Sequence, residues 1–382
     1  MSPFNKTFYY AVFALIGTII GAGIFGLPYV VQKAGFTLGL FWLIFLGLVT
    51  LYLHLMYGEI VLRTPGKHRY TGFVRKYFSK QGSILASIIN IIGTFGVLLA
   101  YLVVGGVFLF NLFYPLIGGR IEMYSLIFFV WASLGVIFSI PLFHKINSIL
   151  VGLLLLIFIV IGFWGAPLVK AENLLKIDGV NFFFPYGVIL FALGGGSAIP
   201  EMVEILKKRP YKIKKAIIIG TLVPLFIFIL FTFAVVGISG SSVAPDAISS
   251  LELYLGRPIV IFGSAIGLLA VITSFFTIGM NLKKIFWYDY KINKYLAAFL
   301  TLFIPLGMFF AGAKNFVEII SLLGVFMSGI DGILMAKLFY AARKRGKKRV
   351  SYRLPFASWM PYTLVVIFIL GMISEIYFET FK

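Results

Sequence analysis

The 382-residue chain has no cysteine and few charged residues, and both absences limit what it can be. Without cysteine there are no disulfide bonds, thiolate metal sites or cysteine nucleophiles. Charged residues make up 12% of the chain and hydrophobic residues 61%, whereas a soluble domain carries about one-quarter charged residues. Lipid is therefore the expected solvent of most of the surface, and we expect one transmembrane domain over residues 1–382.

Enzyme motifs are missing as well. The sequence has no GxSxG elbow, no HExxH helix, no P-loop and no pair of acids at a useful spacing. Residues 21–26, GAGIFG, match GxGxxG, but they lie inside an apolar run rather than at a strand-to-helix turn. We therefore expect no catalytic residue, no enzyme activity and no cofactor other than a coupling ion.

The net charge of +20 is unusual for so apolar a chain. Basic patches can bind nucleic acid, but here the Lys and Arg residues occupy alternate short loops, which is a topology signal of membrane proteins. With the N-terminus in the cytoplasm, 26 of the 33 Lys and Arg residues lie inside and 7 outside. This predicts an integral protein of the cell (plasma) membrane with a cytoplasmic N-terminus, an outer C-terminus and no nucleic-acid partner.

Apolar runs of the roughly 20 residues that a bilayer requires predict an all-α polytopic protein with eleven spans. Their ranges are 7–33, 36–62, 83–115, 123–142, 146–166, 181–206, 214–238, 258–282, 294–311, 315–341 and 359–379. The first run is too long for a cleaved signal peptide. Between two spans, residues 241–257 have apolar residues at helical spacing, which predicts a surface helix outside, packed against the loops or forming part of a gate.

Two of the spans carry glycine clusters at their centres. The first contains Gly17, Gly21, Gly23 and Gly26 before Pro28, and the sixth contains three consecutive glycines, 194–196, before Pro200. Interior glycine and proline destabilise a helix, so both spans should unwind there. Because the clusters are five spans apart, residues 7–166 and 181–341 are expected to be inverted repeats, with 359–379 as an extra helix.

An unwound span leaves backbone polar groups unpaired, which hydrocarbon does not tolerate unless something else satisfies them. The half-helix that begins after each break presents free N–H groups and suits a carboxylate, while the half-helix that ends there presents free carbonyls and suits an ammonium group or a cation. A zwitterion fits both ends. The alternative interpretation, that the glycines only allow close helix packing, is weaker for two corresponding breaks.

The segments 17–35, 191–208 and 214–240 resemble the amino acid permeases of the APC superfamily, in particular the aromatic and hydroxy amino acid permeases and the amino acid/auxin permeases. The resemblance implies the five-plus-five inverted-repeat transporter fold with broken helices 1 and 6 and an eleventh helix. It also implies that helices 1, 2, 6 and 7 rock against a scaffold of helices 3, 4, 8 and 9.

The resemblance further implies a substrate site. The N–H groups around Ala22, Gly23 and Ile24 would hold the carboxylate of the amino acid, and Tyr101 would close over it. Its amino group would meet carbonyls of the two breaks, at Ile19, Phe191, Ala192, Gly194 and Gly195. Since no Lys or Arg lies near either break, we expect a neutral amino acid, with aromatic or other large apolar side chains as candidates.

Two coupling ions are compatible with the sequence. Residues 270–274, AVITS, are similar to the Ala-x-x-Thr-Ser pattern of sodium symporters with this fold. The resemblance implies a sodium site made by Ala270, Thr273 and Ser274 with the carbonyls of Gly17 and Ile20, since neutral oxygens suit a small hard cation that must leave again. Helix 5 lacks the lysine that some proton-coupled members place there.

A proton could instead use an ionisable group inside the membrane. The candidates are Glu201, His54 and Asp331, with structural alternatives for each: Glu201 as a helix cap, His54 as a hydrogen-bonding partner within the bundle, and Asp331 as a hydrated group near the cytoplasm. The sequence therefore predicts a sodium- or proton-coupled symporter that carries a neutral amino acid into the cell by alternating access. The competing hypothesis is an amino acid receptor on a transporter scaffold.

Overall fold

The structure, a computed structural model, describes residues 3–138, 143–346, 350–355 and 358–380, and every regular element in these ranges is helical. Three helices are short: α4 (Tyr70–Tyr77), α8 (Ala171–Leu174) and α12 (Glu252–Leu255). The spans are α1 (Pro3–Ile19) with α2 (Gly23–Ala34), α3 (Phe36–Arg63), α5 (Lys80–Ile117), α6 (Ile121–Phe138), α7 (Phe143–Gly165), α9 (Pro185–Ala192) with α10 (Ile199–Ile205), α11 (Ile213–Ser239), α13 (Arg257–Lys284), α14 (Lys294–Phe310), α15 (Phe316–Leu322) with α16 (Gly329–Arg345), and α17 (Met360–Thr380).

Each of the eleven predicted ranges contains helix, although residues 139–142 of the fourth lie outside the described residues. Among the described residues, eight helices are long and apolar enough to cross a membrane, the bent pair α1–α2 makes a ninth, and the fifth and ninth ranges contain shorter apolar helices. Both predicted breaks are present: α1 and α2 form one span bent by 54°, and α9 and α10 are separated by the glycine-rich segment 193–198. A third interruption, the π-helical turn Leu323–Ser328 between α15 and α16, was not predicted.

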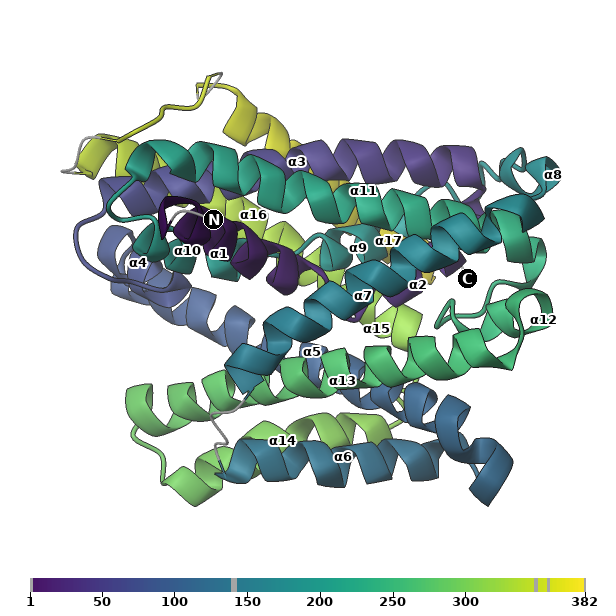
Figure 1. Cartoon of the computed structure of the whole chain (residues 1–382). Helices are drawn as coiled ribbons and strands as arrows, with labels where there is room; N and C mark the ends of the chain where they lie inside the picture. The colour runs from purple at the N-terminus through teal and green to yellow at the C-terminus, as the bar shows by residue number, and fades with distance from the viewer. Residues whose placement is uncertain (1–2, 139–142, 347–349, 356–357, 381–382) are drawn as a thin grey trace.

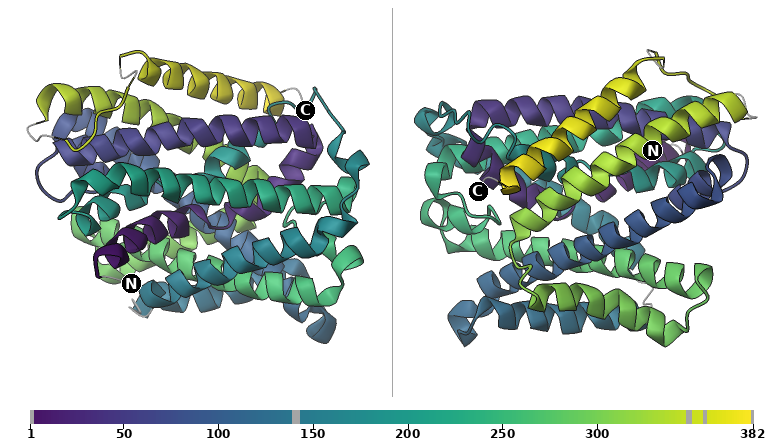
Figure 2. Two further views of the ribbon diagram at one scale, coloured as in Figure 1. Left: turned by 45° about the horizontal axis from the view of Figure 1, so that its top comes forward. Right: turned by 180° about the vertical axis from the view of Figure 1, so that it is seen from behind.

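Figures 1 and 2 show the long helices running between the same two ends of the molecule. The scaffold spans α5, α6, α13 and α14 pack together on one side (Figure 1). On the other side α1 packs against α10 and α11, and α11 packs against α3. This is the separation into four scaffold helices and four bundle helices that the predicted fold requires.

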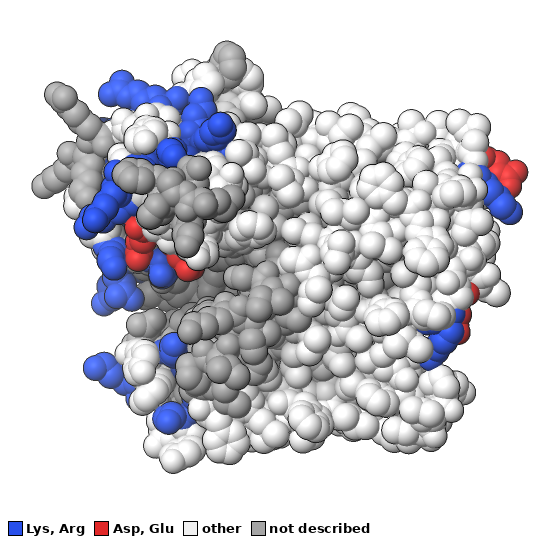
Figure 3. Space-filling view, in the orientation of Figure 1, with Lys and Arg blue, Asp and Glu red and all other residues white. Residues whose placement is uncertain are grey.

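Lys and Arg gather at one end of the molecule, and few lie at the other (Figure 3). Six of the 33 Lys and Arg side chains counted in the sequence lie outside the described residues: Lys6, Lys145, Lys347, Lys348, Arg349 and Lys382. Figure 3 also shows that the molecule is hollowed at this basic end, between the bundle and the scaffold. The opposite end has no comparable hollow on the face shown.

Residues 241–257 do not form the surface helix that was predicted for the outer side. They fold as short helical turns, Gly240–Ser242, Ser249–Leu251 and α12, around a buried carboxylate. Asp246 accepts hydrogen bonds from the Ser249 hydroxyl at 2.7 Å and the Asn111 amide at 3.1 Å, and burial raises the pKa of its carboxyl. The chain folds around the buried Asp246 side chain instead of continuing as a regular helix. The apolar spacing of this segment therefore predicted the wrong local structure.

A buried ionic network ties the basic end together. Glu59 on α3 is fully buried and accepts hydrogen bonds from Arg63 at 2.7 Å, from Arg343 on α16 at 2.8 Å and from the N–H of Leu354 at 2.9 Å. Arg63 lies one helical turn from Glu59, whereas Arg343 and Leu354 come from far along the chain. The network fixes the segment after α16 against α3.

Glu59→Ala should strongly destabilise the protein. Removing one member of a buried ion pair leaves the two arginines uncompensated, which costs about 3–5 kcal/mol. The matched control is Glu252→Ala, because Glu252 pairs with Arg257 at an exposed site where such a pair contributes about 1 kcal/mol or less. Melting temperatures in detergent would measure both, and equal shifts would contradict the assigned role of Glu59.

Gly23→Ala should destabilise the crossing of the two broken spans. A Cβ at position 23 would lie 2.7 Å from the Cα of Ala192, and because that atom is backbone it cannot move aside easily. Overpacking of this kind costs about 1–3 kcal/mol. Gly307→Ala on α14 is the control, since a Cβ there meets nothing within 4 Å. If the Gly23→Ala and Gly307→Ala proteins have the same melting temperature, the two broken spans are not closely packed.

Candidate functional site

The first break lies between α1 and α2. The N–H of Ile20 bonds to the carbonyl of Ile16 at 2.8 Å, and that of Gly21 bonds to Ile19 at 3.0 Å. The N–H groups of Ala22, Gly23 and Ile24 then donate to no acceptor among the described residues, although all three residues are buried. These are the groups predicted to hold a carboxylate.

The second break lies between α9 and α10. The N–H of Leu193 bonds to Ile189 at 3.0 Å, and the N–H of Gly194 bonds to the Phe191 carbonyl at 3.1 Å. Within the described part of the chain, the carbonyls of Ala192, Leu193 and Gly194 accept no hydrogen bond. Of the predicted acceptors for an amino group, Ala192 and Gly194 are thus unpaired, whereas the carbonyls of Ile19, Phe191 and Gly195 already accept one bond each within their turns.

The two breaks are in direct contact. Gly23, the first residue of α2, lies against Ala192, the last residue of α9. Ile19, the last residue of α1, covers Gly195, which precedes α10. A helix start with free N–H groups therefore adjoins a helix end with free carbonyls, so partial charges of opposite sign meet at one place.

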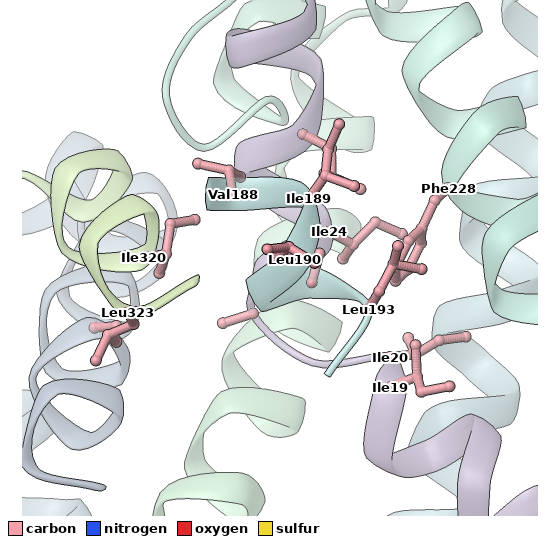
Figure 4. Packing of buried hydrophobic residues seen from close by; sticks show 14 of the residues in the cluster. Ile19, Ile20, Ile24, Val188, Ile189, Leu190, Leu193, Phe228, Ile320 and Leu323 are labelled. Carbon is pink, nitrogen blue, oxygen red and sulfur yellow. The ribbon is translucent and has the colours of Figure 1, made fainter. Parts of the chain in front are cut away.

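Apolar side chains surround this place (Figure 4). Ile24 from α2, Leu193 after α9 and Phe228 from α11 gather around the breaks, and all three are fully buried. Leu190 on α9, Ile320 on α15 and Leu323 directly after α15 also belong to this apolar cluster (Figure 4), and α9 packs against α15. Of these residues only Ile24 was predicted, and only for its backbone N–H, because Leu, Ile and Phe occur throughout every span and carry no local signal. Their chemistry suits an uncharged side chain.

Tyr101 joins the first break to the scaffold. It is 7% exposed on α5, and its hydroxyl lies 3.6 Å from where a Cβ on Gly21 would stand. The same hydroxyl interacts with the side chain of Ser274 on α13. The structure therefore brings Tyr101 and Ser274, which were predicted for different ligands, to a single point beside the break in the first span.

The residues predicted for sodium lie on α1 and α13. The Thr273 hydroxyl donates to the Ala270 carbonyl at 2.9 Å, so two of the expected ligands contact one another. The carbonyls of Gly17 and Ile20 accept no hydrogen bond from any described residue. These neutral oxygens fit a small hard cation, which is the donor chemistry that the pattern requires.

The three proton-coupling candidates have different surroundings. Glu201 is exposed in the first turn of α10 and caps no N–H there, so the helix-cap alternative is wrong. His54 is buried and shares a 3.0 Å hydrogen bond with Thr221 on α11. This contact matches the structural alternative for His54, a hydrogen-bonding partner within the bundle. Asp331, in the first turn of α16, interacts with Tyr70 on α4.

The break in the sixth span is open on one side. Gly194, Ser197 and Glu201 are exposed, as is Thr18 on α1, whereas Ala22 and Ile24 beyond the first break are buried. These exposed residues belong to the halves of the spans that lead to the basic end, where the molecule is hollowed (Figure 3). Two further hollows, of about 670 and 430 Å³, are lined by other parts of the chain and do not include the breaks.

Comparison with known proteins agrees with this geometry. The tyrosine-specific transport system 1 of Haemophilus influenzae is 24% identical, with 94% of this chain and 92% of the relative aligned. The glutamine transporter 2 of Aliivibrio fischeri is 23% identical over 89% and 90% of the two chains. A crystal structure of MhsT in complex with L-phenylalanine superposes with a TM-score of 0.71 over 95% of this chain and 96% of MhsT, at 16% identity, which shows a shared fold.

The model of one protein family covers almost the whole chain. The match extends over residues 5–375, from α1 to the last turns of α17, and so includes both breaks, the scaffold and the eleventh helix. The fold is accordingly the five-plus-five inverted-repeat transporter fold with broken helices 1 and 6 and one additional span. This chain is a member of the tryptophan/tyrosine permease family of integral membrane proteins.

Proposed function

We propose that this protein is a secondary active transporter that carries a neutral amino acid into the cell together with a cation. The observation that supports this most directly is the meeting of the α2 start and the α9 end, with free N–H groups on one and free carbonyls on the other. A zwitterion satisfies both sets at once. The whole chain acts as one transmembrane domain, with residues 7–166 and 181–341 as opposed repeats.

The expected substrate has a large apolar or aromatic side chain. The walls beside the breaks are apolar, and Gly21 and Gly196 leave room next to the backbone, since a Cβ on either would stand at least 3.6 Å from its nearest neighbour. Residues 7–32 and 179–200, which contain the two breaks, include no Lys, Arg, Asp or Glu. The family description and the tyrosine-specific relative support an aromatic amino acid, and the glutamine transporter supports a wider neutral class.

Sodium is the coupling ion that the contacts favour. Ser274 faces Tyr101 beside the first break, and the carbonyls of Gly17 and Ile20 are free of other partners among the described residues. His54 is engaged by Thr221, and Glu201 is exposed, so neither is a group isolated within the membrane. Asp331 is the strongest candidate for a proton-coupled mechanism.

Alternating access follows from the asymmetry of the breaks. The exposed half of each broken span leads to the basic end, and loops rich in Lys and Arg remain in the cytoplasm. We therefore assign the basic end, with the N-terminus, to the cytoplasm of a plasma-membrane protein, and the structure to an inward-facing state. Movement of α1, α3, α10 and α11 against the scaffold would close this side.

Uptake into proteoliposomes tests the function. A panel of radiolabelled amino acids would be supplied with an inward sodium gradient, an inward proton gradient, or neither. We expect concentrative uptake of neutral amino acids, aromatic ones foremost, with the sodium gradient. Binding without uptake would support the receptor hypothesis, and equal uptake under all three conditions would contradict coupling.

Ser274→Ala should weaken sodium coupling. Loss of one of about five or six oxygen ligands should raise the sodium concentration for half-maximal uptake by roughly tenfold, while uptake at saturating sodium is largely retained. The control is Ser374→Ala on α17, whose hydroxyl bonds to the Gly371 carbonyl of its own helix. If the two variants have the same sodium dependence, Ser274 is not a ligand.

A further inference from the structure

A hollow of about 430 Å³ lies at the basic end, away from the two breaks. It is formed by α4, the first three turns of α5 and the turn that follows α13, and Figure 1 shows α4 beside the start of α5. Arg75 from α4 and Lys80 from α5 line it, and no Asp or Glu does. It is therefore a positively charged cavity.

These two cations differ from their neighbours in the same region. Lys67 and Arg69 both pair with Glu204 on α10, and Lys76 donates to the Pro65 carbonyl at 2.9 Å. Arg75 and Lys80 are exposed and have no carboxylate partner among the described side chains. Their charge is available to an anion that enters the hollow.

The α5 wall of the hollow has two chemical faces. Ser83, Ser87 and Asn90 recur at intervals of four and three residues and so lie on one face of the helix. Ile84 and Ile91, seven residues apart, line the adjacent face, and Ile84 is 50% exposed. A hydrogen-bonding face thus runs beside an apolar face that borders the lipid.

The length and position of the hollow select among anions. From Lys80 to Ile91 the wall extends about 16 Å at 1.5 Å per residue, similar to half of the roughly 30 Å hydrocarbon thickness. A free phosphate would use only the basic mouth. An anionic phospholipid would place its phosphodiester at the two cations, its glycerol near the hydroxyls and the first part of an acyl chain along the isoleucines.

We propose that this hollow binds an anionic phospholipid of the cytoplasmic leaflet, with Arg75 and Lys80 holding its phosphate. The proposal uses the cytoplasmic assignment of the basic end but not the transport activity. Basic pockets between spans on the cytoplasmic side are suited to lipid head groups, and each surface Lys or Arg strengthens binding roughly fivefold. The lipid would connect α4 to the scaffold helices α5 and α13.

Native mass spectrometry of the full chain in detergent tests this directly. Phosphatidylglycerol and phosphatidylcholine with identical acyl chains would be titrated into the wild type, Arg75→Gln/Lys80→Gln and Lys76→Gln. We expect the wild type and Lys76→Gln to retain phosphatidylglycerol in preference to phosphatidylcholine. The double variant should bind phosphatidylglycerol about 30-fold more weakly, since two cations are lost.

Equal retention of phosphatidylglycerol by the wild type and the double variant would overturn the proposal. Displacement of the lipid by millimolar inorganic phosphate would also overturn it, because the site would then belong to a free anion. Thermal melting of each variant identifies any that is misfolded. Lipid retention is measured without any uptake assay. A protein that binds the lipid but does not transport amino acids would therefore contradict the proposed function and leave the lipid proposal intact.

Discussion

Unpaired peptide groups inside a membrane are the constraint on which this structure depends. Each N–H or carbonyl without a partner in hydrocarbon costs several kcal/mol, so two unwound spans are tolerated only where their free groups can be satisfied. The fold meets this requirement by packing Gly23 against Ala192, which brings the start of one half-helix to the end of another. Under the proposed function, a bound amino acid would complete the hydrogen bonding of this backbone.

Some residues around the breaks form the proposed binding site, and others stabilise the fold that holds it. Ile24, Leu193 and Phe228 are buried on one side of the breaks, and the low dielectric there would strengthen the electrostatic interaction of peptide dipoles with the proposed zwitterion. Tyr101 links the broken first span to Ser274 of the scaffold. Farther away, the Glu59 network fixes the basic end through groups that never approach the substrate.

Much of this arrangement could be predicted from the sequence, because lipid imposes simple rules. Apolar length predicted the spans, and glycine clusters predicted both breaks, since few residues permit a helix to unwind in mid-membrane. Predictions failed where partners are distant along the chain. Nothing near Glu59 indicates Arg343, and nothing near Asp246 indicates Asn111, so the outer segment was expected to be helical. The apolar walls were missed because Leu190 resembles any other membrane leucine.

The most direct measurement of the central claim compares three ligands of the purified protein. The best amino acid substrate would compete for binding against its decarboxylated amine and its deaminated acid, each lacking one charge of the zwitterion. If free N–H groups hold the carboxylate and free carbonyls hold the ammonium group, both analogues should bind at least about 100-fold more weakly. An analogue that competes as well as the parent amino acid would contradict recognition by the two broken helices.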